Sequence, residues 1–201
     1  QGATSLRFAT VNPEFIVLAW KDKVFYNNLT QADVLLVDGY GLWVALKLLG
    51  FQGQRVTGAD LVPIILEQAE KENKVVCIVI PSQGLTTPAR AEQVLQKRFP
   101  QLGVQVVVQE VVLPGADVYL FALGAPAQEY AAAEQQQGIC IGVGGAIDFL
   151  VGTQKRAPQY MQKFGLEWMW RWAQQPHRTK RIWQATVVFS WLFIQPLFSQ
   201  K

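Results

Sequence analysis

Six short runs rich in valine and isoleucine recur along the chain, and longer amphipathic stretches separate them. The runs lack a clean alternation of apolar and polar residues, which is typical of strands covered on both faces. Strands that alternate with helices in this way predict an α/β fold built on a mainly parallel sheet. The expected strands are Leu6–Thr10, Val34–Val37, Val75–Ile80, Val104–Val108, Val118–Leu123 and Ile139–Val143.

The stretches between these runs have the length and periodicity of helices, and two of them begin with readable capping residues. Thr57 precedes Asp60 by three residues, as in a capping box, and Thr87 stands directly before Pro88. We therefore expect a Rossmann-like core with helices on both faces of the sheet, followed by a C-terminal helical appendage. The expected helices are Pro13–Asn27, Leu42–Leu49, Asp60–Glu72, Pro88–Phe99, Gln128–Gln136 and Leu166–Gln174.

The composition supports a folded protein from a reducing compartment. Half of the 201 residues are apolar and only 16% are charged, which excludes an intrinsically disordered chain. Cys77 and Cys140 both lie inside apolar runs, so we expect buried thiols rather than a disulfide. The sequence does not begin with a basic segment followed by an apolar one, so we expect no secretory signal in it.

Charge divides the chain into two parts. Residues 1–152 hold 10 Lys/Arg and 14 Asp/Glu, whereas residues 153–201 hold 8 Lys/Arg, a single acid and five of the seven tryptophans. We interpret residues 1–152 as the Rossmann-like core and 153–201 as a basic, aromatic helical appendage. Nucleic acid, an anionic membrane surface and a phosphorylated substrate are the usual partners of such a tail.

The last part of the appendage, Ile182–Phe198, is a run of 17 residues without a charge. Spanning a bilayer takes about 20 mostly apolar residues, and this run contains Pro196, so it is too short and interrupted for a confident assignment as a transmembrane helix. Its tryptophans and the basic residues upstream suit a helix lying in a membrane interface. The alternative is a helix packed on the core or on another subunit.

Polar residues and glycines follow four of the expected strands. In a parallel sheet, ligands bind outside the carboxyl ends of the strands. The sequence therefore predicts a ligand cleft at this edge, formed by Thr10–Glu14, Asp38–Gly41, Gly124–Glu129 and Gly142–Asp148.

Asp38 is the strongest candidate for a catalytic group. It ends an apolar strand and enters a Gly-x-Gly turn, so a partly buried carboxylate there could act as a general base. The alternative is an aspartate that caps the helix beginning near Gly41.

Metal and cofactor sites find little support. His177 is the only histidine, the two cysteines lack metal spacing, and no Asp-x-Asp occurs. Walker A and a G-x-G-x-x-G after the first strand are also absent. We expect no cofactor and no metal, so a transferase here would stabilise a leaving diphosphate with backbone amides and arginines.

Three arginines of the appendage, Arg171, Arg178 and Arg181, are spaced by seven and three residues. Pro176 interrupts a continuous helix, so we expect two helices to bring them together. Planar guanidinium groups suit a diphosphate. The alternative is a stripe that faces solvent or lipid headgroups.

Eight segments in this order resemble the WecG/TagA/CpsF family of bacterial glycosyltransferases across essentially the whole chain. Each segment is weak alone, and their common order carries the resemblance. They are Thr10–Glu14, Val37–Gly41, Gln54–Asp60, Gly124–Glu129, Gly142–Asp148, Arg156–Pro158, Gly165–Arg171 and Pro176–Arg178.

The resemblance implies an inverting, metal-independent transfer of N-acetylmannosamine or a related sugar from a UDP donor to a polyprenyl-diphosphate-linked sugar. Such products enter teichoic acids or other surface polysaccharides. It also implies a cytoplasmic enzyme, peripheral on the inner face of the cell membrane, that can form a homo-oligomer.

The resemblance also assigns roles to residues. Asp38 would deprotonate the acceptor, and Thr10, Asn12 and Gln128 would position the reacting sugars. Arg171, Arg178 and Arg181 would hold the lipid diphosphate. The implied substrate-binding residues are Arg55, Thr57, Gly58, Asp60, Gly124, Pro126, Glu129, Gly144, Gly145 and Asp148.

Two departures from the family pattern allow an alternative function. Ala127 stands where lysine is common, and the link Gln109–Ala116 replaces a longer stretch. The alternative is a non-catalytic nucleotide-sugar-binding protein that recruits partners to a membrane. We expect no nucleic-acid partner, because the tail aromatics lie mainly in an apolar run rather than among its basic residues.

Overall fold

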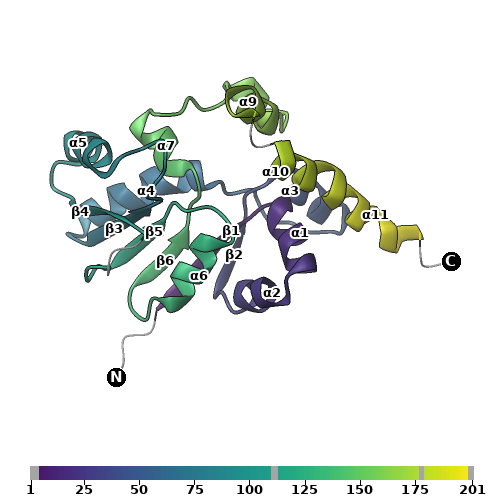
Figure 1. The fold of residues 1–201 in the computed structure, drawn as a ribbon, viewed down its shortest axis with the longest axis horizontal. Coiled ribbons are helices and arrows are strands. Elements are labelled where there is room, and N and C mark those ends of the chain that lie inside the picture. Colours follow the sequence, from purple (N-terminus) through teal and green to yellow (C-terminus); the bar gives the residue numbers. More distant parts are fainter. Residues whose placement is uncertain (1–4, 110–112, 177–178, 199–201) are drawn as a thin grey trace.

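The computed structural model describes residues 5–109, 113–176 and 179–198. Its core is one six-stranded sheet in which all neighbouring strands are parallel, in the order β2-β1-β6-β5-β3-β4 (Figure 1). The predicted α/β class and parallel sheet are confirmed. The strands are β1 (Leu6–Val11), β2 (Val34–Val37), β3 (Val75–Ile80), β4 (Gly103–Val108), β5 (Val118–Phe121) and β6 (Ile139–Gly142).

Helices connect most of the strands and then continue into the tail. Those of the core are α1 (Pro13–Lys21), α2 (Lys23–Thr30), α3 (Tyr40–Leu48), α4 (Gly58–Lys71), α5 (Pro88–Arg98), α6 (Ala127–Glu134) and α7 (Ala146–Val151). Those of the tail are α8 (Gln159–Lys163), α9 (Glu167–Gln174), α10 (Thr179–Trp183), the π-helical turn η2 (Gln184–Val188) and α11 (Phe189–Phe198).

Alternate side chains of the central strands enter two different cores. In β3, Val76 and Ile78 pack with α4, α5 and α7, whereas Cys77 and Val79 pack in a second cluster with α6. Because successive side chains of a strand point to opposite faces, helices cover both faces of the sheet, as predicted. Cys77 and Cys140 are buried free thiols, which confirms that prediction as well.

The predicted helix Pro13–Asn27 is wrong, because the structure divides this segment into two helices. Asp22 ends α1, and its Oδ1 accepts hydrogen bonds from the backbone amides of Val24 and Phe25 at 2.8 and 3.1 Å. An aspartate in this position caps a new helix more favourably than it continues the old one. The break turns α2, so that Phe25 packs edge-to-face on Phe15, with ring centroids 5.6 Å apart.

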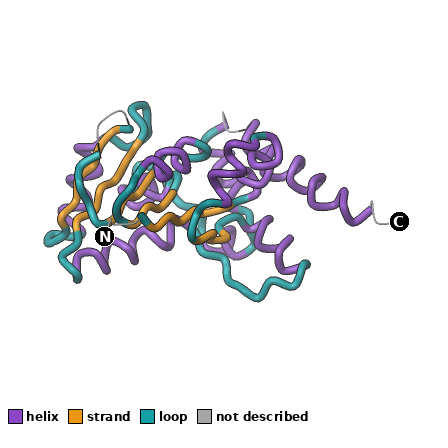
Figure 2. Tube along the Cα trace, turned by 90° about the horizontal axis from the view of Figure 1, so that it is seen from below, coloured by secondary structure: helices purple, strands orange, loops and turns teal. Residues whose placement is uncertain are grey.

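The tail returns to the core and packs on it. Phe189 is only 7% exposed and lies in the same cluster as Phe15 of α1. In Figures 1 and 2, α11 lies at the end of the molecule that is remote from β3 and β4. One face of the segment Ile182–Phe198 therefore packs on the core, which was the alternative to a helix in a membrane interface. Its exposed residues include Trp183, Val187, Trp191 and Ile194.

No helix in the described parts of the chain is both long and apolar enough to cross a membrane.

Candidate active site

The carboxyl ends of β1, β2, β5 and β6 open into one cavity of about 890 Å³, which tail residues also line. This volume lies in the range of sites for small molecules. The sheet edge predicted to hold a ligand is the one that forms the cavity. Twelve of the predicted site residues line it: Thr10, Asn12, Asp38, Arg55, Thr57, Gly124, Gln128, Gly144, Gly145, Asp148, Arg171 and Arg181.

Strand register fixes the position of Asp38. Val37 pairs with Val11 at the ends of β2 and β1, and the next amide, that of Asp38, donates to the Val11 carbonyl at 2.8 Å. Helix α3 begins after Gly39, and no side chain caps it. The alternative role of Asp38 as a helix cap is therefore wrong, and Asp38 lines the cavity.

The surroundings of Asp38 tune its proton affinity. Burial raises the pKa of Asp38 to about 6, and the carboxylate of Glu167 acts in the same direction. The positive charges of Arg171 and Arg55, and the backbone of Gly58, lower it in part. A carboxyl whose pKa is near the working pH is suited to general-base catalysis.

Arg55 brings a positive charge to the edge of the cavity. Its Nη1 donates to the Asp38 carbonyl at 3.3 Å, and its guanidinium lies 6.0 Å from the ring centroid of Tyr40. The Asp38 carbonyl and the Tyr40 ring thus hold the Arg55 side chain beside the turn between β2 and α3.

Gln128 ties together the two glycine turns that follow β5 and β6. Its Oε1 accepts hydrogen bonds from the amides of Gly124 at 3.1 Å and Gly144 at 3.0 Å. Both glycines have positive φ angles, +77° and +52°, which residues with a side chain rarely adopt. Gln128 is 2% exposed, and its two hydrogen bonds fix both turns at the edge of the cavity.

Thr10 and Asn12 brace the end of β1. The Thr10 hydroxyl donates to the Gly142 carbonyl of β6 at 2.7 Å, and Asn12 Oδ1 accepts from the Glu14 amide at 2.9 Å, capping α1. Both residues line the cavity while one polar atom of each is held by the protein.

Arg171 of α9 lies over the turn after β6. Its guanidinium carbon is 4.9 Å from the ring centroid of Phe149, and its Nη2 would be 2.9 Å from a Cβ atom added to Gly145. Burial lowers the pKa of Arg171, and its buried Nε has no hydrogen-bond partner among the described residues. A cation held in this way lacks a full set of partners and suits an anionic ligand.

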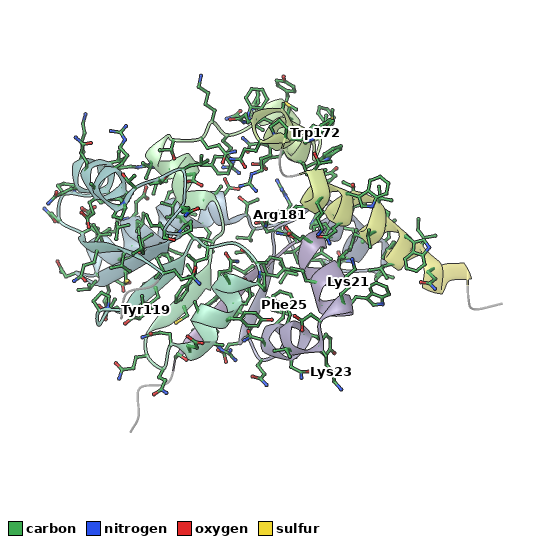
Figure 3. All side chains as sticks on the ribbon, viewed as in Figure 1. Lys21, Lys23, Phe25, Tyr119, Trp172 and Arg181 are labelled. Carbon is green, nitrogen blue, oxygen red and sulfur yellow. The ribbon has the colours of Figure 1, made fainter. Side chains whose placement is uncertain are left out.

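Arg181 of α10 lies between the tail and the core (Figure 3). Its Nε and Nη2 donate to the two carboxylate oxygens of Glu14 at 2.8 and 2.9 Å. Both terminal nitrogens are 3.8 Å from the position of a Cβ on Gly124. The structure thus brings Arg171 and Arg181 to the same cavity from two helices, as predicted, whereas Arg178 lies outside the described residues.

A model of the Glycosyl transferase WecG/TagA/CpsF family matches residues 1–201. The chain belongs to this glycosyltransferase family. The predicted family is therefore confirmed, and with it the assignment of the protein as an enzyme that transfers a sugar.

Three relatives share the name N-acetylglucosaminyldiphosphoundecaprenol N-acetyl-beta-D-mannosaminyltransferase. The one from Bacillus spizizenii is 29% identical, covering 86% of this chain and 73% of its own. The one from Bacillus subtilis is 26% identical, with coverages of 87% and 73%, and the one from Staphylococcus aureus is 25% identical, with coverages of 85% and 73%.

Four predicted substrate-binding residues do not line the cavity of this family member: Gly58, Asp60, Pro126 and Glu129. Asp60 instead binds Arg156, whose Nη2 lies 3.1 Å from its Oδ2, and accepts a hydrogen bond from Thr57 at 2.6 Å. These contacts hold Asp60 as part of the cap of α4.

Glu129 is buried behind Gln128. Burial raises the pKa of Glu129 to about 8, and neither of its carboxylate oxygens has a hydrogen-bond partner among the described atoms. It lines a separate cavity of only about 10 Å³, with room for about one water molecule. With this pKa, Glu129 is mostly protonated at pH 7.

Local sequence did not assign roles to three residues that the structure places at the site. Glu14 pairs with Arg181, Glu167 lines the cavity near Asp38, and Arg156 Nε lies 3.5 Å from Glu167 Oε1. All three stand in segments that carry the family resemblance. Their partners are remote in sequence, so only their presence in these segments could have indicated them.

Carboxylates at the site are dispersed rather than clustered. Within the described residues, no three side chains of His, Cys, Asp or Glu are grouped so that they could hold a metal ion. Metal independence of the reaction stays a prediction, and the positive charges at the cavity come from Arg55, Arg171 and Arg181.

Proposed function

We propose that this enzyme transfers N-acetylmannosamine from its UDP donor to the sugar of a polyprenyl-diphosphate-linked acceptor. The proposal combines the relatives' shared name with a cavity that holds a base and three arginines. The acceptor sugar is N-acetylglucosamine in the relatives' name, and we propose the same for this chain. The product would be an intermediate of a cell-surface polysaccharide such as a teichoic acid.

The observation that carries the chemistry is Asp38, a cavity carboxylate whose pKa is raised to about 6. At neutral pH it is mostly ionised and takes the proton of the acceptor hydroxyl. The hydroxyl oxygen then forms a bond to the anomeric carbon, while the bond from that carbon to the diphosphate oxygen breaks. The proton stays on Asp38, and UDP leaves with the bonding electrons.

Attack from the side opposite the diphosphate inverts the anomeric centre. The relatives' name specifies a β-linked product, which inversion yields from an α-linked nucleotide sugar. One base and no covalent sugar–enzyme intermediate are sufficient for this reaction.

The leaving diphosphate acquires negative charge as the bond breaks. Arg55 near Asp38, together with the amide of Gly145 in the glycine turn after β6, supplies donors to the cavity, while the Gly144 amide stays bonded to Gln128. Fixed donors that face developing charge stabilise a transition state strongly, because they need little reorganisation. We assign them to UDP, and Arg171 and Arg181 to the diphosphate of the lipid acceptor.

We propose a peripheral position on the inner face of the cell membrane. The exposed side of the tail presents Trp183, Trp191 and Ile194, and Lys180 and Arg181 precede them. Tryptophan and basic residues together favour a headgroup region. Sedimentation with anionic vesicles tests this: the double variant Trp183→Gln/Trp191→Gln should sediment less than wild type, and equal sedimentation would contradict it.

The decisive experiment mixes the full chain with UDP-N-acetylmannosamine and a prenyl-diphosphate-linked N-acetylglucosamine in the presence of a metal chelator. UDP and a disaccharide lipid should form together, as read by mass spectrometry. Asp38→Asn should lower turnover about 100-fold or more, the range expected for loss of a general base. Binding of UDP should persist in the variant. UDP binding without transfer by wild type would instead support the non-catalytic nucleotide-sugar binder.

A further inference from the structure

The cavity extends beyond its polar end into a second, apolar end. On one side this end is lined by Val44, Ala45 and Leu48 of α3, and on the other by Phe189, Phe193 and Ile194 of α11. We call these six residues the α3–α11 trough. None of them carries a charge or a polar side chain, in contrast to the end that holds Asp38.

The trough has a closed floor and an open rim. Ala45 and Phe189 at the floor are 5% and 7% exposed, whereas Leu48 and Ile194 at the rim are 74% and 45% exposed. An apolar channel that opens to the surface leaves hydrophobic area in contact with water. Burial of that area by an apolar ligand is favourable.

The backbone of the tail is irregular where it borders this channel. The π-helical turn η2 precedes α11, and its residues Ala185 and Thr186 line the cavity next to the trough. π-Helical turns occur often at functional sites. The irregular turn therefore marks the passage from the polar to the apolar end.

Arg181 and Ile182 join the two ends. Arg181 faces the glycine turn at Gly124, and the next residue, Ile182, lines the cavity toward the trough. From Asp38 outward, a ligand would meet a base, then a guanidinium group, then hydrocarbon. An acceptor that consists of a sugar, a diphosphate and a prenyl chain presents its groups in the same order.

Apolar surface continues outside the rim. Trp191 is one helical turn from Ile194 on α11, and its ring packs edge-to-face on that of Trp20, with centroids 6.2 Å apart. Trp20 and Trp191 are 59% and 53% exposed. A chain leaving the trough would pass these rings, which suit the interface of a bilayer.

We propose that the α3–α11 trough binds the first isoprene units of the lipid acceptor and makes the enzyme favour prenyl-linked over short-chain acceptors. This inference rests on the proposed function for the identity of the acceptor. The trough places the prenyl subsite between α3 and α11.

Direct binding tests the trough without sugar transfer. Titration calorimetry compares farnesyl diphosphate with methyl diphosphate on the full chain. Wild type should bind the farnesyl compound more tightly by about tenfold or more, because several methylene groups leave water. The double variant Leu48→Glu/Ile194→Glu, at exposed positions that tolerate charge, should lose this preference. Its affinity for methyl diphosphate and for UDP should stay unchanged.

A matched control comes from the next residue of the chain. Leu49 is 65% exposed but does not line the cavity, so Leu49→Glu should keep the farnesyl preference. Equal binding of both diphosphates by wild type would overturn the proposal, as would an equal loss in Leu49→Glu. A change in sedimentation coefficient of the double variant with unchanged farnesyl binding would also overturn it, and would assign the trough to a second copy of the chain.

These outcomes separate the trough from the proposed function. A farnesyl preference that depends on Leu48 and Ile194 supports the trough even if no N-acetylmannosamine is transferred. Transfer that does not depend on prenyl length would leave the proposed function intact and contradict the trough.

Discussion

Arg181 and Glu14 form a two-point ion pair across 167 residues of sequence, with Nε–Oε1 and Nη2–Oε2 distances of 2.8 and 2.9 Å. Glu14 lies in the first turn of α1, directly beyond the end of β1, and Arg181 lies in the tail. The pair fastens the appendage to the edge of the sheet where the cavity opens. It also fixes the guanidinium that we assign to the lipid diphosphate.

Glu14→Gln should loosen the tail. The substitution removes the charge that holds Arg181 while keeping the side-chain length. Because Arg181 is partly exposed, we expect a loss of only about 1 kcal/mol. Hydrogen exchange of the amides in residues 179–195 should become severalfold faster. The exposed pair Lys74–Asp117 at the far end of the sheet gives a control: Lys74→Gln should leave exchange in the tail unchanged. Unchanged exchange in Glu14→Gln would show that the pair does not hold the appendage.

The pH dependence of transfer should follow Asp38. With its pKa raised to about 6, the carboxylate is ionised above that pH and protonated below it. We therefore expect kcat/KM to fall about tenfold per pH unit below pH 6. Glu167 raises the pKa of Asp38, so Glu167→Gln should move this limb to lower pH. A limb that does not move would contradict the electrostatic contact between the two groups.

Gln128→Met should destabilise the protein and impair catalysis together. The variant keeps the side-chain volume but leaves the amides of Gly124 and Gly144 without an acceptor. Each unsatisfied buried donor costs about 1–3 kcal/mol, which denaturant unfolding would measure. Gln136→Met, on the exposed surface beyond α6, is the control and should have no effect. Full activity of Gln128→Met would show that the glycine turns hold their shape unaided.

Glu129→Gln should change how stability depends on pH. The folded-state pKa of Glu129 is raised to about 8, above the ordinary value of 4.5, so its contribution is present below pH 4.5 and is lost as pH rises through 8. At pH 9 the variant should exceed wild type in free energy of unfolding by roughly 4 kcal/mol relative to their difference at pH 4. Glu134→Gln, an exposed site on the same helix, should show no such trend. Parallel curves for wild type and Glu129→Gln would contradict the burial of a neutral carboxyl.

Gly145→Ala should separate binding from folding. A Cβ at this position would lie 2.9 Å from Arg171 Nη2, the end of a flexible side chain, so the arginine moves and the backbone stays. We expect the melting temperature to change by about 2 °C or less and KM for the acceptor to rise about fivefold. Gly115→Ala is the control, since a Cβ there meets no atom within 4 Å. Unchanged KM would show that the position of Arg171 is not critical for acceptor binding.

Much of the site was predictable because it follows the strands. Asp38, Gly124 and Gly144 each stand directly after an apolar run, and parallel strands bring their carboxyl ends to one edge. Local patterns could not show the break at Asp22, since an aspartate within an apolar-periodic stretch is compatible with a single helix. Only the structure shows that Asp22 caps a second helix, because its Oδ1 accepts hydrogen bonds from the amides of Val24 and Phe25.

The roles of charged residues depended on partners that lie far along the chain. Asp60 was expected at a substrate because it sits in a family segment, yet it binds Arg156, 96 residues later. The sequence left two alternatives for the tail, a helix in a membrane interface and a helix packed on the core. In the structure, Phe189 packs in the same cluster as α1, so one face of the tail lies on the core.

The sequence by itself determined the strands, the sheet edge that carries the cavity and the family, because apolar periodicity and the residues after each strand are local properties. Only the tertiary structure decided which carboxylates face the cavity and which arginines they hold. The physical reason is that burial and ion pairing depend on distances between residues such as Glu14 and Arg181, and these are set by how the whole sheet and its tail pack.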